Sequence, residues 1–218
     1  MPLYLRPHAE VAERVLLPGD PGRALRLAQQ LLTEPKMLNH NRGLWGYTGA
    51  AADGAPMTIQ STGLGGPSTA IVVEELIALG ARRLVRVGTC GGFGALELGS
   101  LVIAETVLAR DGASRAIGAA SELAADPQLL AALVAAGDGA VSGPVVSTDL
   151  YYAPAPETDA LAVDLTTAAI LAVAARDGAA AAAVLAVSDR MATGDRLDPD
   201  ALERAEVELG RVGAAAFA

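Results

Sequence analysis

The stretch Leu84-Val85-Arg86-Val87-Gly88-Thr89-Cys90-Gly91-Gly92 decides the fold of this chain. An apolar run that contains one arginine and ends in glycines is typical of a buried strand followed by a turn. On its N-terminal side, residues 68–79 have the apolar spacing of a helix that Gly80 ends, and residues 56–62 form a strand-like run. Strand, helix and strand in this order predict a crossover that buries a sheet, and therefore an α/β fold.

The rest of the chain repeats this alternation. We expect one domain over residues 1–218, because no repeat or linker composition interrupts it. Ser68 or Thr69 is expected to cap the central helix, Glu34-Pro35-Lys36 to form a turn, and residues 112–140 to be largely surface cover. The other expected strands are 15–17, 44–51, 101–109, 141–147, 161–165 and 180–187, and the other expected helices are 23–32, 166–176, one from Asp126-Pro127 and one from Asp198-Pro199 to about residue 215.

The composition excludes several kinds of chemistry. Among the 16 basic residues Lys36 is the only lysine, and Cys90 is the only cysteine. A single cysteine excludes an internal disulfide, and with two distant histidines it makes no zinc cluster, so no metal site is expected. Lys36 follows no glycine-rich loop, which argues against a phosphate-binding loop lysine and against Schiff-base catalysis. The sequence also lacks a G-x-S-x-G nucleophile elbow.

The net charge of −9 limits the partners of the protein. Neither nucleic acid nor an anionic membrane surface attracts a chain of this charge, and no run of 18 apolar residues occurs. The N-terminus does not have the basic flank and apolar run of a secretion signal. We therefore expect a soluble cytoplasmic protein, in which an anionic small molecule would need a local cluster of arginines.

Four strand ends carry glycines or polar side chains, at residues 18–23, 62–69, 86–92 and 188–190. Ligands of open α/β sheets bind outside the carboxyl ends of the strands. A guanidinium, a hydroxyl and a glycine amide together suit a phosphate dianion, although each loop taken alone is better explained by surface solvation. Arg86 is the strongest indication, because a charge among apolar strand residues is costly to bury without a partner.

Four blocks of this sequence stand in an order that one family shares. They are Leu17-Pro18-Gly19-Asp20-Pro21 with Arg23, Asn41-Arg42-Gly43 with Gly46-Tyr47-Thr48-Gly49, Thr62-Gly63-Leu64-Gly65-Gly66-Pro67-Ser68, and Arg86-Val87-Gly88-Thr89-Cys90-Gly91-Gly92. The chain resembles the hexameric purine nucleoside phosphorylases and uridine phosphorylases from about His8 to Asp189. The resemblance implies their three-layer α/β/α fold around a mixed, twisted, partly barrel-like sheet.

The resemblance also implies an activity and an assembly. The activity is that of a pentosyltransferase, which converts a nucleoside and inorganic phosphate to a free base and a pentose 1-phosphate without a cofactor. The site would be shared between two subunits, so the catalytic unit would be a homodimer, with three dimers in a hexamer. The implied phosphate-binding residues are Gly19, Arg23, Arg86 and Thr89 of one subunit and Arg42 of its neighbour.

The same resemblance assigns roles around the nucleoside. Asp189 would protonate the departing purine, with Arg86 as a second catalytic residue and Arg190 or Arg196 as the candidate that assists the acid. From the residues alone, Asp189 is explained better as a turn cap, and Tyr152 is expected in the core. The implied nucleoside-binding residues are Cys90, Gly91, Tyr151, Asp164, Leu165, Thr166 and Ser188, with His8 of the neighbouring subunit near the ribose 5′-hydroxyl. The alternatives are a small buried apolar residue for Cys90, core packing for Tyr151 and a solvated N-terminal residue for His8.

Two departures from the family pattern bear on the substrate. The family's ribose-binding Glu-Met-Glu is Asp164-Leu165-Thr166 here, so Thr166 replaces the carboxylate that accepts the ribose 2′- and 3′-hydroxyls. The chain between Tyr152 and Ala162 lacks the Gln-x-Arg pair that reads uracil, which together with Asp189 favours a purine nucleoside. The alternatives are a uridine phosphorylase-like enzyme, and a relative that binds nucleoside or phosphate without turnover. A phosphate-independent nucleosidase ranks lower, because the arginine cluster is retained.

Overall fold

The computed structural model of the protein describes residues 2–154 and 156–218. The strands are β1 (Arg14–Leu17), β2 (Thr33–Asn39), β3 (Gly46–Ala50), β4 (Pro56–Gln60), β5 (Arg83–Gly92), β6 (Leu101–Ala109), β7 (Glu122–Ala124), β8 (Val141–Ser147), β9 (Ala162–Asp164) and β10 (Ala180–Arg190). The helices are α1 (Pro21–Leu31), α2 (Gly65–Ala78), α3 (Gly112–Ile117), α4 (Pro127–Ala136), α5 (Thr167–Asp177) and α6 (Pro199–Ala215), with a short 3-10 turn η1 (Asn41–Gly43).

The sheet is mixed, and part of it closes on itself. β10 pairs with β5 in parallel and with β6 in antiparallel, and β6, β8, β9 and β5 pair in sequence, so these strands form a ring. From β5 the sheet continues outward through β1, β4, β3 and β2. Arg86 lies at the centre of this arrangement, opposite Leu17 on β1 and Ala183 on β10.

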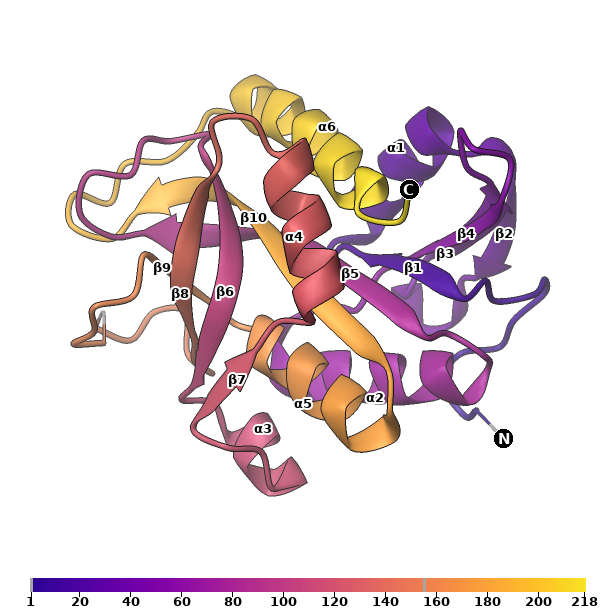
Figure 1. Ribbon diagram of the computed structural model, residues 1–218, viewed down its shortest axis with the longest axis horizontal. Coiled ribbons are helices and arrows are strands. Elements are labelled where there is room, and N and C mark those ends of the chain that lie inside the picture. Colours follow the sequence, from indigo (N-terminus) through magenta and orange to yellow (C-terminus); the bar gives the residue numbers. More distant parts are fainter. Residues whose placement is uncertain (1, 155) are drawn as a thin grey trace.

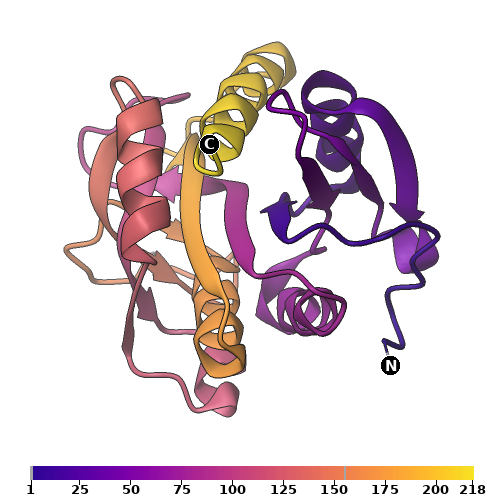
Figure 2. The ribbon, with the colours of Figure 1, turned by 45° about the vertical axis from the view of Figure 1, so that its right-hand side comes forward.

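Helices cover the sheet on two sides, as Figures 1 and 2 show. α1, α4 and α6 lie on one side, and α2, α3 and α5 on the other. Each side has its own cluster of buried apolar residues. The predicted three-layer α/β/α arrangement around a partly barrel-like sheet is confirmed.

Small residues bring the layers close together. A Cβ at Gly213 of α6 would overlap Val87 of β5, and one at Gly210 would overlap Leu27 of α1. Buried alanines fill much of α5 and β10. The high alanine and glycine content therefore reflects close packing of helices on the sheet, because interiors are packed to crystal-like density.

Two local predictions are wrong. Lys36 lies in β2 and not in a turn, and the irregularity there is a register shift next to Glu34, whose φ is 48°. α2 begins at Gly65 with Leu64 at the cap, so Ser68 lies inside the helix and donates a hydrogen bond to the Thr62 carbonyl.

Two other local expectations are confirmed. Residues 112–140 hold α3, β7 and α4, and apart from a few buried side chains such as Leu129 and Leu133 they are intermediate or exposed, as expected for surface cover. Helices begin at Asp126-Pro127 and Asp198-Pro199 as expected, and Asp126 and Asp198 cap them.

Every helix in the part of the chain that the structure describes is too short or too polar to span a membrane.

Candidate active site

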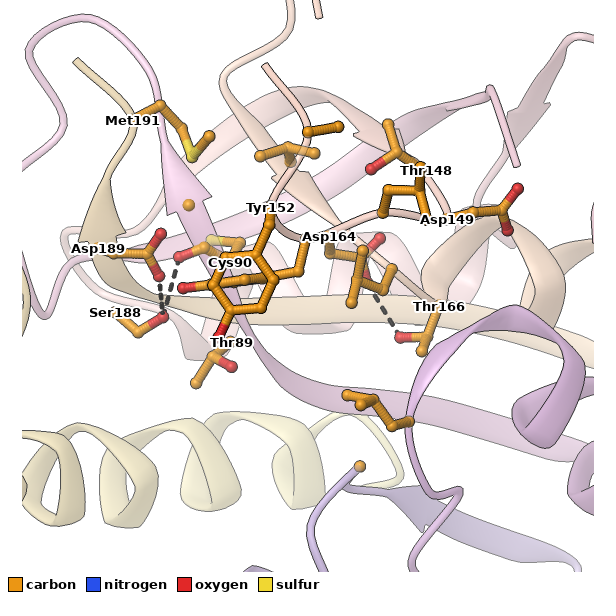
Figure 3. A pocket seen from close by; sticks show the side chains of 18 of the residues that line it. Thr89, Cys90, Thr148, Asp149, Tyr152, Asp164, Thr166, Ser188, Asp189 and Met191 are labelled. Atoms are coloured by element: carbon orange, nitrogen blue, oxygen red, sulfur yellow. Dashed lines mark hydrogen bonds between the residues drawn. The ribbon is translucent and has the colours of Figure 1, made fainter. Parts of the chain in front are cut away.

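The carboxyl ends of β1, β5 and β10 meet at a cavity of about 810 Å³. All four strand ends that the sequence singled out contribute to it, together with Asp164–Thr166 after β9 and the segment from Thr148 to Pro154. Figure 3 shows the side chains of Thr89, Cys90, Asp164, Ser188 and Asp189 around this space. The strands of the closed ring therefore fix the positions from which these side chains start.

Arg86 is buried at one end of the cavity, with 6% of its surface exposed. Its Nη1 donates to the Leu17 carbonyl oxygen at 3.2 Å, and its Nε has no hydrogen-bond partner among the described residues. The pKa of Arg86 is lowered to about 10. Desolvation is the main cause, Asp164 opposes the shift, and the nearby charge of Arg23 adds to it. The side chain is thus still a cation at neutral pH.

Two glycines make room for this guanidinium. A Cβ at Gly88 would overlap the Arg86 side chain, so only glycine allows it to fold back along its own strand. A Cβ at Gly19 would lie 3.3 Å from Arg86 Nη1, which places the turn before α1 directly against the guanidinium. Both glycines therefore serve the placement of one charge.

Arg23 contributes a second guanidinium to the same cavity, and its surface is also 6% exposed. It lies in the first turn of α1, which Asp20 caps by accepting from the Arg23 backbone N–H at 2.7 Å. Arg23 Nη2 is 2.8 Å from Glu206 Oε1, and Arg23 Nε has no partner in residues 2–154 and 156–218. Two buried cations with unsatisfied donors thus converge, which is the arrangement that a multiply charged oxyanion satisfies.

The Asp164 carboxylate accepts several hydrogen bonds from nearby residues of its own chain. It accepts from Ser147 Oγ at 2.5 Å, from Thr166 Oγ1 at 3.1 Å and from Thr167 Oγ1 at 2.6 Å, and also from the Thr167 backbone N–H. Ser147 Oγ in turn accepts from the Ala168 N–H at 3.0 Å. Asp164 therefore holds the first residue of α5, whose N-cap is Thr166, and Thr166 lines the cavity with a hydroxyl whose proton is already donated.

Asp189 lies at the opposite end of the cavity, where β10 ends. Ser188 Oγ lies 2.8 Å from Asp189 Oδ1 and 3.2 Å from the Cys90 carbonyl oxygen, its two possible acceptors. A Cβ at Gly91 would lie 3.1 Å from Asp189 Oδ2 and close to the Met191 sulfur. Met191 and Asp189 therefore occupy the space that a side chain at Gly91 would need.

Aromatic and basic side chains surround the mouth of the cavity. Tyr151 and Tyr152 form an edge-to-face pair with ring centroids 5.1 Å apart, and the Arg196 guanidinium lies 5.7 Å from the Tyr151 ring centre. Tyr152 is 92% exposed, so the prediction that it belongs to the core is wrong. Arg190 and Arg196 both line the cavity, so the two candidates for the residue that assists Asp189 lie on the same wall.

The two residues expected to serve a neighbouring subunit lie outside this cavity. His8 and Arg42 are exposed, and the N-terminal segment docks on residues 38–42 through a hydrogen bond from the His8 N–H to the Leu38 carbonyl. The His8 ring stacks on His40 at 5.3 Å, and Arg42 lies over the Tyr4 ring at 5.4 Å. The structure thus brings together all the other predicted site residues and places these two on one surface elsewhere.

Several residues of the cavity were not predicted, among them Arg110, Met191 and Thr148. Arg110 directly follows β6, so the strand-end rule extended to that strand would have found it. Met191 lacks a polar signal, and only the fold places it at the cavity. Across the described ranges, no group of three or more His, Cys, Asp or Glu side chains is arranged to hold a metal ion.

Comparison with known proteins adds the family. A family model described as the phosphorylase superfamily matches residues 13–218. A DeoD-type purine nucleoside phosphorylase of Caldanaerobacter subterraneus subsp. tengcongensis is 33% identical over 219 residues, which cover 93% of this chain and 94% of that protein. A guanosine phosphorylase of Halorubrum lacusprofundi is 33% identical and covers 91% of this chain and 87% of its own. A uridine phosphorylase of Treponema pallidum is 43% identical over 116 residues, or 53% of this chain and 42% of that protein.

The chain belongs to the phosphorylase superfamily. The resemblance seen in the sequence is confirmed, and with it an enzyme of the nucleoside phosphorylase type, in the pentosyltransferase class. The names of the relatives include purine nucleosides, guanosine and uridine, so membership of the family does not by itself select a base.

Cys90 provides a direct test of the enclosure of this site, since it is the only thiol in the chain. It is buried, and desolvation together with the Asp164 and Asp189 charges raises the pKa of its thiol far above the usual range. Because the thiolate is the reactive form, we expect slow labelling by a disulfide reagent at pH 8 and rapid labelling of one thiol per chain after unfolding. Fast labelling of the folded protein would contradict this burial.

Proposed function

We propose that this enzyme catalyses phosphorolytic cleavage of the N-glycosidic bond of purine nucleosides, giving the free base and ribose or deoxyribose 1-phosphate. Inorganic phosphate is the co-substrate, and no cofactor takes part. A uridine phosphorylase-like activity is the alternative within the same class. The preference for purines is supported by Asp189 in the wall of the cavity, and by the predominance of purine names among the relatives.

One observation carries the proposal. Arg23 and Arg86 are both 94% buried at one end of the cavity, and each has an Nε with no partner in the part of the chain that the structure describes. Unsatisfied buried donors on cations are expensive, so a site of this kind calls for an anionic ligand. Gly19 and Thr89, which also line this region, are the remaining residues that we assign to phosphate.

The mechanism follows from the two ends of the cavity. As the glycosidic bond breaks, the sugar gains positive charge, and phosphate held by Arg86 and Arg23 stabilises that charge. The base leaves with negative charge, and a proton from Asp189 to the purine N7 relieves it, which contributes ~10²–10⁴ in rate. Ser188 Oγ lies 2.8 Å from Asp189 Oδ1, so we assign the proton transfer to Oδ2, the oxygen without this neighbour.

Product analysis tests this assignment. We expect the purified protein to release purine from inosine, adenosine or guanosine only when phosphate is present, and to form pentose 1-phosphate in equal amount. Faster turnover of uridine would replace the purine assignment by the alternative. Release of base without phosphate would identify a nucleosidase, and phosphate binding without any release would identify a non-catalytic relative.

In the same assay, Arg86→Ala should abolish phosphorolysis, because it removes the cation nearest to Gly19. Arg176→Ala is the matched control, since Arg176 forms surface ion pairs with Asp177 and Glu74 away from the cavity. Near-normal turnover of the Arg86 variant would overturn the assignment of the phosphate site.

The pentose end of the cavity predicts an altered sugar preference. Thr166 offers a neutral hydroxyl where the family pattern has a carboxylate, and Asp164 is fully occupied by its own chain. A hydrogen bond to a charged group contributes ~1.5–3 kcal/mol and one to a neutral group ~1 kcal/mol. The ribose 2′-hydroxyl therefore contributes less binding free energy in this enzyme than in an enzyme with glutamate at this position.

We expect the ratio of kcat/KM for a ribonucleoside to that for its 2′-deoxy analogue to be below about tenfold. Thr166→Glu should raise this ratio, whereas Thr166→Gln, of matched size without the charge, should leave it close to wild type. A wild-type ratio as high as that of a glutamate-bearing relative would contradict this account of the pentose site.

We further infer that the catalytic unit is a homodimer, with three dimers in a hexamer, in which Arg42 and His8 approach the phosphate and ribose of the neighbouring site. Their placement on one exposed surface supports this, as does the left-handed backbone of Arg42, with φ of 58°. Sedimentation at assay concentration is expected to give an assembly of even order, and a catalytically active monomer would refute the sharing.

A further inference from the structure

We propose that Glu206 is a positioning residue of the phosphate site, which holds the Arg23 guanidinium in place and balances the charge of the two buried cations. The inference rests on the proposed function, since it concerns the same site. Glu206 lies on α6, more than 180 residues from Arg23 along the chain, and 4% of its surface is exposed.

The geometry joins two helices at the cavity. α1 and α6 lie side by side on one face of the sheet (Figures 1 and 2). Glu206 Oε1 is 2.8 Å from Arg23 Nη2, and Glu206 Oε2 accepts a hydrogen bond from Arg26 Nη2, one turn further along α1. The carboxylate thus bridges two arginines, of which Arg23 faces the cavity and Arg26 reaches the surface.

The charges explain why a carboxylate is needed at this position. Arg23 and Arg86 are like charges buried in one site. Their repulsion favours a conformation in which the Arg23 side chain turns out into solvent. Glu206 offsets this repulsion from behind Arg23. Arg26 neutralises the carboxylate in turn, so the group of Arg23, Arg26 and Glu206 keeps one net positive charge and still attracts phosphate.

The planar guanidinium makes the contact directional. Its donors form a fixed fork, so holding Nη2 determines where the other N–H groups point. Arg23 Nε has no partner in the described residues, and the contact of Nη2 with Glu206 fixes the direction of this donor as well. Stability alone does not account for Glu206, because buried ion pairs seldom stabilise a fold more than apolar residues of the same size.

Glu206→Gln tests the proposal, with Glu208→Gln as the matched control. Glu208 is on the same helix and pairs with Arg211 at the surface. We expect Glu206→Gln to raise the phosphate KM about tenfold and to leave the nucleoside KM within about twofold of wild type. Glu206→Asp, which keeps the charge, should recover part of the loss, and Glu208→Gln should match wild type.

Calorimetric titration with inorganic phosphate, without nucleoside, provides a measurement independent of turnover, and Glu206→Gln should weaken this binding by a similar factor. An unchanged or tighter affinity for phosphate, or an equal rise in both KM values, would overturn the role of Glu206. Failure of the proposed function looks different, because the wild-type protein would then bind phosphate without cleaving nucleosides, or cleave them without phosphate.

Discussion

The burial of two guanidinium groups beside one another is the constraint on which the rest of this structure depends. Arg86 lies in β5 and its side chain runs along the strand over Gly88, where a Cβ would overlap it. A Cβ at Gly19 would lie 3.3 Å from Arg86 Nη1, so the turn before α1 is also close to the guanidinium. The second guanidinium, on Arg23, forms an ion pair with Glu206 of the neighbouring helix α6. Strand, turn and helix thus hold two like charges close together, and the phosphate dianion that we propose as ligand would relieve their repulsion.

The sequence predicted what depends on local pattern. The strand around Arg86, the turn at Gly19 and the end of β10 at Asp189 are marked by apolar runs that stop at glycine or polar residues, and each lies where expected. Residues whose role depends on distant partners were missed. Glu206 lies at helical spacing from Leu209 and Gly213, which are buried on the same helix. This spacing predicts a buried position for Glu206, but the reason for a buried carboxylate is clear only when Arg23 is known to contact it.

At the pentose end of the cavity, Thr166 affects more than its own position, because it also takes part in the hydrogen bonds around Asp164. Thr166 and Thr167 both donate to Asp164, and Ser147 adds a third hydroxyl, so the carboxylate has become part of the frame of α5. A buried network of this kind is rigid when fully satisfied. Under the proposed function the sugar would meet a neutral hydroxyl here, whereas Arg23 and Arg86 each keep an Nε without a partner in the described residues.

The closed ring of β5, β10, β6, β8 and β9 has an evolutionary consequence. Of the residues that we assign to phosphate, Arg86 and Thr89 lie on β5, and Gly19 and Arg23 lie in the turn and helix that follow β1, whereas Tyr151, Tyr152 and Arg196 come from connecting segments. Loops accept substitution and insertion more readily than the paired strands they join. Under the proposed function, substitutions in these segments would change the preferred base more readily than the phosphate site, and the relatives of this chain are indeed named for different nucleosides.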